Sequence, residues 1–144
     1  MSAPAIEGLA HWTCISSDIE KAVQFYVDVL GAQHHVRPSG APQAVGIAGT
    51  NIDFFLATDD EPAAPGPYGQ HHALKIRLED YDRWIEHFNA LGVPYFMADH
   101  GPQRISLYVD DPDGYHLELT VGVDEETGKR EIEKRGIKTF TSPH

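Results

Sequence analysis

Residues 106–119 read SLYVDDPDGYHLEL, in which two short runs of alternating side chains flank a tight turn. The turn is the Asp-Pro-Asp-Gly segment at 111–114, where proline pre-sets one backbone angle and glycine tolerates a left-handed one. On either side, polar and apolar residues alternate with the period of two that is typical of a strand with unlike faces. The stretch therefore predicts two consecutive strands, at about 104–109 and 115–121, joined by this turn.

The second half of this stretch has an echo earlier in the chain. Residues 114–119 (GYHLEL) correspond to residues 49–54 (GTNIDF), and in both segments an acid follows the glycine by four positions. These acids are Asp53 and Glu118. The chain therefore contains an internal repeat, and each copy ends in a glycine-led strand that carries one acid.

The two copies also open in the same way, with a histidine at the start of a short strand-like run. His11 opens the first copy and His71 opens the second. A helix follows in each, because apolar residues recur at helical spacing over 19–30 and 81–91 and a glycine ends both runs. The remaining strands are expected at 10–16, 71–76 and 94–97, with three short ones between 32 and 57. Each copy is thus predicted to fold as β-α-β-β-β, which is an α+β arrangement.

The predicted organisation is a single domain built from two modules. Module one covers about 8–57, a linker covers 58–70, module two covers 71–122, and a C-terminal tail covers 123–144. The linker is rich in proline and glycine, which interrupt strands and helices. In the tail, residues 124–136 are dense in charges of both signs and predict a solvated helix, with a role in packing or dimer contact.

Composition excludes several classes of function. The 144 residues include 22 acidic and 11 basic side chains, for a formal net charge of −11. Such a chain repels phosphate backbones and anionic lipid, so we expect no nucleic acid partner. No stretch approaches the roughly 18 apolar residues of a membrane span, so we expect no membrane insertion. The single cysteine, Cys14, rules out an intrachain disulfide. With no export signal recognised, the predicted location is the cytoplasm.

The repeated histidine and acid predict a metal site. If the two copies pack about a pseudo-twofold axis, His11, Asp53, His71 and Glu118 converge on one point. Two neutral imidazoles and one carboxylate suit a divalent metal that keeps open positions for substrate or oxygen, namely Fe(II), Mn(II), Ni(II) or Zn(II). Asp53 is one methylene shorter than Glu118, so its role as a fourth ligand stays open. The competing interpretation is that the histidines only cap strands and the acid is exposed.

The faces that carry these residues are polar. Alternate side chains of a strand share one face, which places Thr13 beside His11 and places Arg104 on the face of Tyr108. The opposite faces are apolar and suited to pack under the helices. The polar faces are therefore expected to line a concave, wet surface that can accept a small molecule.

These motifs resemble the vicinal oxygen chelate superfamily, which includes glyoxalase I, extradiol ring-cleaving dioxygenases, fosfomycin-resistance proteins and bleomycin-binding proteins. The resemblance covers roughly residues 8–122, and its most specific parts are LAHWT at 9–13, HHA at 71–73 and the stretch at 106–119. It implies two paired βαβββ modules that form a partly open, mixed β-sheet barrel around a metal held by His11, His71 and Glu118. It also implies a homodimer.

Among the reactions of this superfamily, extradiol ring cleavage ranks first. In those dioxygenases a tyrosine ten residues before the metal-binding glutamate contacts the substrate oxygen, and Tyr108 stands at that position. A histidine in the preceding loop acts as acid and base, and His100 lies one position away from that place. The resemblance thus implies Fe(II) at the metal site, with Tyr108 and His100 as catalytic residues.

Two other enzyme types remain open. In the fosfomycin-resistance proteins, the positions of Thr13, Arg104 and Tyr108 contact the phosphonate in some members, but a cationic pocket position is Met97 here and the serine-rich potassium loop is replaced by residues 100–103. Arg104 would then be the main cation for a dianion, unless it only bridges a surface acid. Glyoxalase I would use a fourth carboxylate ligand, for which Asp53 is the candidate.

A binding protein of the bleomycin-resistance type is the alternative outside enzymology. Such a protein would sequester an aromatic or cationic compound, and the acidity of this chain suits a cation. Those relatives typically lack the set of two histidines and one glutamate, whereas this chain has it. The intact set therefore favours a metalloenzyme with a small-molecule substrate.

Overall fold

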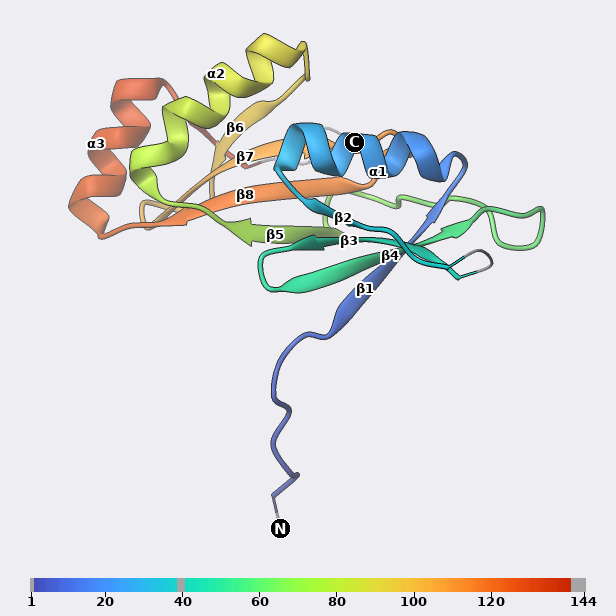
Figure 1. Ribbon diagram of the computed structural model, residues 1–144. Helices are drawn as coiled ribbons and strands as arrows, with labels where there is room; N and C mark the ends of the chain where they lie inside the picture. The colour runs from blue at the N-terminus through green and yellow to red at the C-terminus, as the bar shows by residue number, and fades with distance from the viewer. Residues whose placement is uncertain (1, 39–40, 141–144) are drawn as a thin grey trace. The chain divides into compact units, whose positions relative to one another are not determined.

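The computed structural model describes residues 2–38 and 41–140 (Figure 1). The chain divides into two compact units, Met1–Ala63 and Ala64–His144. The boundary falls inside the proline-rich segment that was predicted to link the two modules. Among the described residues, no helix is long and apolar enough to cross a membrane.

The first unit is a four-stranded mixed sheet with one helix. Its strands follow the order β1-β4-β3-β2, in which β1 is parallel to β4 and the other neighbours are antiparallel. The elements are β1 (His11–Ser16), α1 (Ile19–Leu30), β2 (Gln33–His35), β3 (Gln43–Ile47) and β4 (Thr50–Leu56). The predicted βαβββ module is therefore confirmed, with all three strands present after the helix.

The second unit repeats this arrangement and adds the tail. Its five-stranded sheet has the order β5-β8-β7-β6-β9, with β5 parallel to β8. The elements are β5 (His71–Lys75), a 3₁₀ turn (Leu78–Asp80), α2 (Tyr81–Leu91), β6 (Phe96–Asp99), β7 (Arg104–Asp110), β8 (His116–Gly122), α3 (Glu125–Arg135) and β9 (Lys138–Thr139). The α+β class with two βαβββ modules is confirmed, and the hydrogen-bond ladders of the described strands form two separate mixed sheets.

The strand registers match between the units and support the internal repeat. In the first unit Thr13 pairs with Asp53, and in the second Ala73 pairs with Glu118. In each case the partner of the acid lies two residues after the histidine that opens the copy. Each histidine and its acid therefore belong to neighbouring parallel strands of one sheet, close enough for their side chains to share a face.

Both repeat helices begin and end where sequence signals predict. At the start of α1, the Asp18 side chain accepts a hydrogen bond from the Lys21 backbone N–H, which satisfies a free donor of the first turn. Gly31 and Gly92 end α1 and α2 in the left-handed conformation that glycine adopts without steric cost. The aromatic residues Tyr26 and Phe88 point from these helices into the core of their own units and are fully buried.

One predicted strand is misplaced. The sequence indicated a strand at 94–97, whereas β6 covers Phe96–Asp99. Pro94 has no N–H to donate to a ladder, and the pairing with β7 joins Phe96 to Tyr108 and Asp99 to Ile105. The shift carries the strand up to residue 99, directly before His100.

The tail forms the predicted helix, α3, and then returns to the sheet. Arg135 near its end pairs with Asp82 of α2 and places its guanidinium 4.7 Å from the centre of the Tyr81 ring. After Gly136, strand β9 runs parallel to β6, and the Phe140 N–H donates to the Asp99 carbonyl at 2.8 Å. The tail is thus an integral part of the second unit.

Candidate active site

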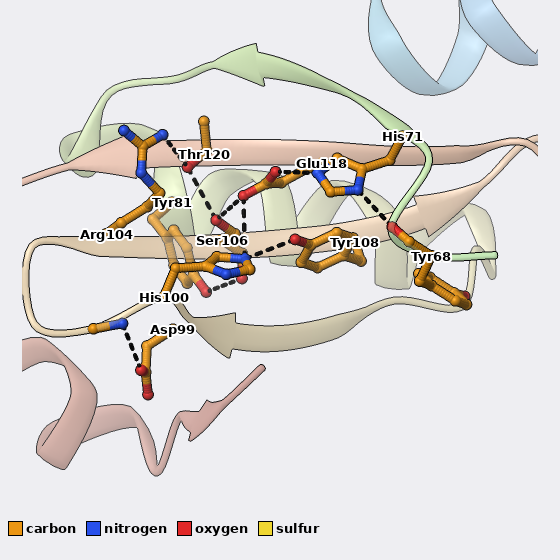
Figure 2. Close-up of polar contacts among 11 residues, drawn as sticks. Tyr68, His71, Tyr81, Asp99, His100, Arg104, Ser106, Tyr108, Glu118 and Thr120 are labelled. Carbon is orange, nitrogen blue, oxygen red and sulfur yellow. Dashed lines mark hydrogen bonds and ion pairs between the residues drawn. The ribbon is translucent and has the colours of Figure 1, made fainter. Parts of the chain in front are cut away.

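Glu118 is the centre of the candidate site. It lies on β8, between β5 and β7, and is only 4% exposed. Its Oε1 accepts a hydrogen bond from the Ser106 hydroxyl at 2.6 Å, and its Oε2 lies 2.9 Å from Nε2 of His71 (Figure 2). Burial of an ionised carboxylate is unfavourable unless hydrogen bonds or a cation compensate it. The surroundings of Glu118 therefore favour a positive charge beside its carboxylate.

The orientation of His71 directs the lone pair of its Nε2 toward the Glu118 carboxylate. Nδ1 of His71 lies 2.6 Å from the backbone carbonyl of Tyr68, which can only accept a hydrogen bond. Nδ1 therefore carries the proton, and in the neutral ring Nε2 is an unprotonated acceptor that faces Glu118. Two acceptors at 2.9 Å repel each other unless a proton or a metal ion lies between them. A backbone carbonyl behind the ring is also how metal-binding histidines are usually held.

The two residues predicted to be catalytic contact each other. The Tyr108 hydroxyl lies 2.7 Å from Nε2 of His100, and that nitrogen is 3.5 Å from Oε1 of Glu118. Burial raises the pKa of Tyr108 well above its usual value, and the negative charge of Glu118 adds to the effect. The phenol therefore stays protonated at neutral pH and can donate a hydrogen bond.

Arg104 approaches the same group of residues from the far end of β7. Its guanidinium lies 3.4 Å from the Thr120 hydroxyl, which is 3.0 Å from the hydroxyl of Ser106 (Figure 2). A chain of polar contacts thus connects Arg104 to Glu118. Within residues 2–38 and 41–140, Arg104 forms no ion pair, so the interpretation that it bridges a surface acid is wrong for this structure.

The predicted residues of the first unit lie on its polar strand face. His11 and Thr13 are exposed residues of β1, paired in register with Asn51 and Asp53. Among the described residues, no group of three or more His, Cys, Asp or Glu is arranged to hold a metal. The ligand set of His11, His71 and Glu118 draws on both units and stays a prediction, of which the second unit brings two members together.

Asp53, the candidate fourth ligand, has a partner in its own unit. Its carboxylate lies 3.1 Å from the guanidinium of Arg37. The sequence offers no signal for this contact, because Arg37 lies in the segment between β2 and β3. The symmetric positions of the two copies therefore carry acids in different electrostatic surroundings.

Aromatic rings surround the candidate catalytic tyrosine. The Tyr108 ring stacks on Phe96, with centroids 4.9 Å apart, and on Phe140, at 5.1 Å. The Phe140 ring also lies 4.9 Å from that of His100. The tail packs, as predicted, and the packing partners of its Phe140 include the two candidate catalytic residues.

The site therefore contains residues to which sequence analysis assigned no role. Ser106 alternates with Tyr108 along one strand face, which is a signal that could have identified it. Tyr68 and Phe140 come from the linker and the tail, and no motif connects them to the site. They reach it through contacts between residues distant in the sequence.

Two βαβββ units, each with a first strand parallel to its last, define the vicinal oxygen chelate class of fold. The half-buried His71 and the buried Glu118 lie on such a strand pair, β5 and β8. The chain belongs to the Glyoxalase/Bleomycin resistance protein/Dioxygenase superfamily, whose family model matches residues 8–119.

Similar proteins include several with names connected to fosfomycin or thiol transfer. The glutathione transferase FosA of Serratia marcescens is 30% identical over 118 residues, which cover 81% of this chain and 82% of the relative. The fosfomycin resistance protein FosX of Listeria monocytogenes is 30% identical over 135 residues, covering 87% and 97%. A crystal structure of FosX from Listeria monocytogenes has a TM-score of 0.70 at 28% identity, and the match covers 88% of this chain and 99% of that one.

A lactoylglutathione lyase structure from Agrobacterium tumefaciens shares the fold. Its TM-score is 0.65 at 22% identity, and the match covers 83% of this chain and 96% of the other.

Proposed function

We propose that this protein is a metal-dependent enzyme that modifies a small phosphonate of the fosfomycin type. The observation that carries the proposal is the polar chain from Arg104 through Thr120 and Ser106 to Glu118. It connects a guanidinium that has no ion pair within the described ranges to the carboxylate proposed to hold the metal. With Arg104 at one end and the proposed metal ion at the other, the chain has a cation at each end, which suits a substrate that bears several anionic oxygens.

The residues proposed to hold the metal are His11, His71 and Glu118. The donor set fits a divalent ion, because His71 presents an unprotonated nitrogen and Glu118 presents a buried carboxylate oxygen beside it. When bound, a divalent metal supplies Lewis acidity to the substrate oxygens that it touches. Ser106 holds the other oxygen of Glu118 and so sets the orientation of the carboxylate.

The substrate is proposed to lie with its phosphonate toward Arg104. Its guanidinium offers several N–H donors, and Thr13 is the further polar contact that the superfamily resemblance suggests. The net charge of −11 opposes the approach of an anion at long range. The local charges of Arg104 and of a bound metal act at shorter range, where they are screened less.

Tyr108 and His100 are proposed to handle the proton of the reaction. The Tyr108 phenol keeps its proton because burial and Glu118 raise its pKa, so it can donate a hydrogen bond to an oxygen on which negative charge develops. His100, in contact with that phenol at 2.7 Å, can accept or return a proton. The name of the FosA relative, a glutathione transferase, supports thiol transfer as the reaction class.

A second candidate, extradiol ring cleavage with Fe(II), is favoured by one specific contact. The hydrogen bond between Tyr108 and His100 joins the two residues that such a mechanism uses, with Tyr108 steadying a substrate oxygen and His100 moving its proton. The similar proteins whose names point to fosfomycin or thiol transfer place this candidate second.

The experiment that tests the proposal loads the protein separately with Mn(II) and Fe(II) and follows fosfomycin by mass spectrometry. Incubations contain glutathione, cysteine or no thiol. A metal-dependent gain of mass equal to the thiol, or to water from opening of the epoxide ring, is the expected result. Oxygen uptake with catechols and Fe(II), without reaction of fosfomycin, would replace the proposal by the second candidate. Tight binding of fosfomycin or an aromatic compound with no product and no metal would indicate a binding protein.

Arg104→Ala is expected to weaken fosfomycin binding about tenfold or more. A hydrogen bond to a charged group contributes about 1.5 to 3 kcal/mol, and about 1.4 kcal/mol corresponds to a factor of ten in affinity. Calorimetric titration of the metal-loaded protein measures the effect, and Arg104→Lys should recover only part of the loss. The matched control is Arg130→Ala, which removes the same charge from an exposed position of α3. Equal affinities of the two alanine variants would contradict the role of Arg104.

A further inference from the structure

We infer that His116 and Asp110 form a positioning pair that holds the Gly66–Tyr68 segment in place and thereby aims His71 at Glu118. The inference rests on the proposed function, because it concerns the orientation of a proposed metal ligand. It assigns a role to the linker, a segment predicted only to connect the two modules. Neither His116 nor Asp110 is proposed to touch the metal or the substrate.

Each ring nitrogen of His116 contacts an oxygen atom of another residue. It is 5% exposed on β8, and its register partners are His71 on β5 and Asp110 on β7. Nδ1 lies 2.7 Å from Oδ1 of Asp110, and Nε2 donates to the backbone carbonyl of Gly66 at 3.0 Å. The imidazole therefore bridges a residue of the sheet and a residue of the linker.

The imidazole of His116 also packs against the aromatic ring of Tyr68. The two rings stack with centroids 3.7 Å apart and an angle of 17° between their planes. The Tyr68 hydroxyl donates to both oxygens of Asp110, at 3.0 and 3.2 Å. Burial and the Asp110 carboxylate raise the pKa of Tyr68 to about 12, so the phenol keeps the proton that these bonds need. Residues 66 and 68 are thus both attached to the His116–Asp110 pair.

This attachment matters because the Tyr68 carbonyl is what orients His71. The linker has no strand or helix to hold it, although the Gln70 N–H donates to the Pro67 carbonyl at 2.8 Å and closes a turn. Nδ1 of His71 lies 2.6 Å from the Tyr68 carbonyl, and this contact sets both the protonated nitrogen and the rotation of the ring. If the turn shifts, Nε2 of His71 loses its fixed direction toward Glu118.

Gly66 has the backbone conformation that the contact requires. Its φ of +73° is in the left-handed region, where residues with a side chain are strained. In this conformation its carbonyl oxygen lies within hydrogen-bond distance of His116. The position of the glycine in the linker is therefore explained by the contact with His116, in addition to its general use in loops.

The test compares His116→Phe with wild type in two measurements. Phenylalanine preserves an aromatic ring for stacking on Tyr68 but removes both hydrogen bonds. In the metal-free protein at alkaline pH, where the imidazole is neutral, nitrogen-detected NMR of the histidine rings is expected to show His71 protonated at Nδ1 in wild type and a mixture of both tautomers in the variant. In a titration with Mn(II), the variant is expected to bind about tenfold more weakly, since partners that orient a metal ligand have effects of this size.

His34→Phe is the matched control, because His34 is an exposed residue of β2 in the other unit. It should change neither measurement. Tyr68→Phe keeps the stacked ring and the backbone carbonyl, loses only the bonds to Asp110, and should give a smaller effect in the same direction. If His116→Phe does not fold, Tyr68→Phe and Asp110→Asn carry the test in its place.

Unchanged His71 tautomer and unchanged Mn(II) affinity in folded variants of the pair would overturn the inference. Absence of Mn(II) binding by wild type would instead count against the proposed function. The tautomer measurement needs no metal, so it still tests the positioning role in that case.

Discussion

Replacing Glu118 by glutamine is expected to weaken the binding of divalent metal by an order of magnitude or more and to remove metal-dependent turnover. The amide keeps the size of the side chain but loses the negative charge. Its carbonyl oxygen can still accept the Ser106 hydroxyl, which bonds to Glu118 at 2.6 Å. The fold should therefore persist, and the loss should concern the metal. Competition titration with Mn(II) and Fe(II), beside elemental analysis of the purified protein, measures it.

The matched control is Glu126→Gln, which removes the same charge from an exposed position at the start of α3. That variant should bind metal like wild type and unfold at nearly the same denaturant concentration. Full metal stoichiometry and affinity in Glu118→Gln would remove Glu118 from the ligand set, and the roles proposed for its neighbours would lose their basis.

Gly128→Ala is expected to destabilise the second unit by about 3 kcal/mol, a typical upper value for forcing an atom into a packed site. Gly128 is a buried residue in the interior of α3. A Cβ atom added there would overlap the backbone carbonyl oxygen of Pro102, and backbone cannot move aside as a flexible side chain can. In an exposed helix the same change would stabilise by up to about 1 kcal/mol, so the expected sign is opposite to that of helix propensity.

Urea unfolding followed by circular dichroism measures this change, with Glu126→Ala as the control at an exposed position of the same helix. Pro102 lies in the loop that carries His100, so a folded Gly128→Ala protein should also have altered activity. An unchanged or increased free energy of unfolding would show that α3 and this loop separate at little cost.

Local patterns were sufficient to predict most elements of both units. The α1 and α2 boundaries followed from apolar spacing and from the glycines at 31 and 92, and the turn at 111–114 located β7 and β8. Comparison of the two copies predicted that His71 and Glu118 belong together, and they lie 2.9 Å apart. Signals of this kind act over a few residues or repeat along the chain, which is why a single sequence reveals them.

Contacts between distant segments were not predictable in this way. The carbonyl of Tyr68 behind His71, the Phe140 ring on Tyr108 and the ion pair of Arg37 each depend on how a loop or tail returns to the sheet. No periodicity marks such residues, because their partners are chosen by tertiary packing. The position of β6 was missed for the same reason, since its pairing with β7 decided which residues form the strand.

The ion pair between Arg37 and Asp53 shows that the two halves of the repeat differ in the partners of their equivalent acids. Equivalent acids occupy equivalent register positions, yet the acid of the first half is neutralised by a guanidinium while that of the second lies beside His71 and His100. A duplicated unit begins with two equal sets of side chains. If Glu118 holds the metal as proposed, Asp53 has kept its register position while it acquired a structural partner, and the two equivalent acids of the described residues contribute differently to the protein.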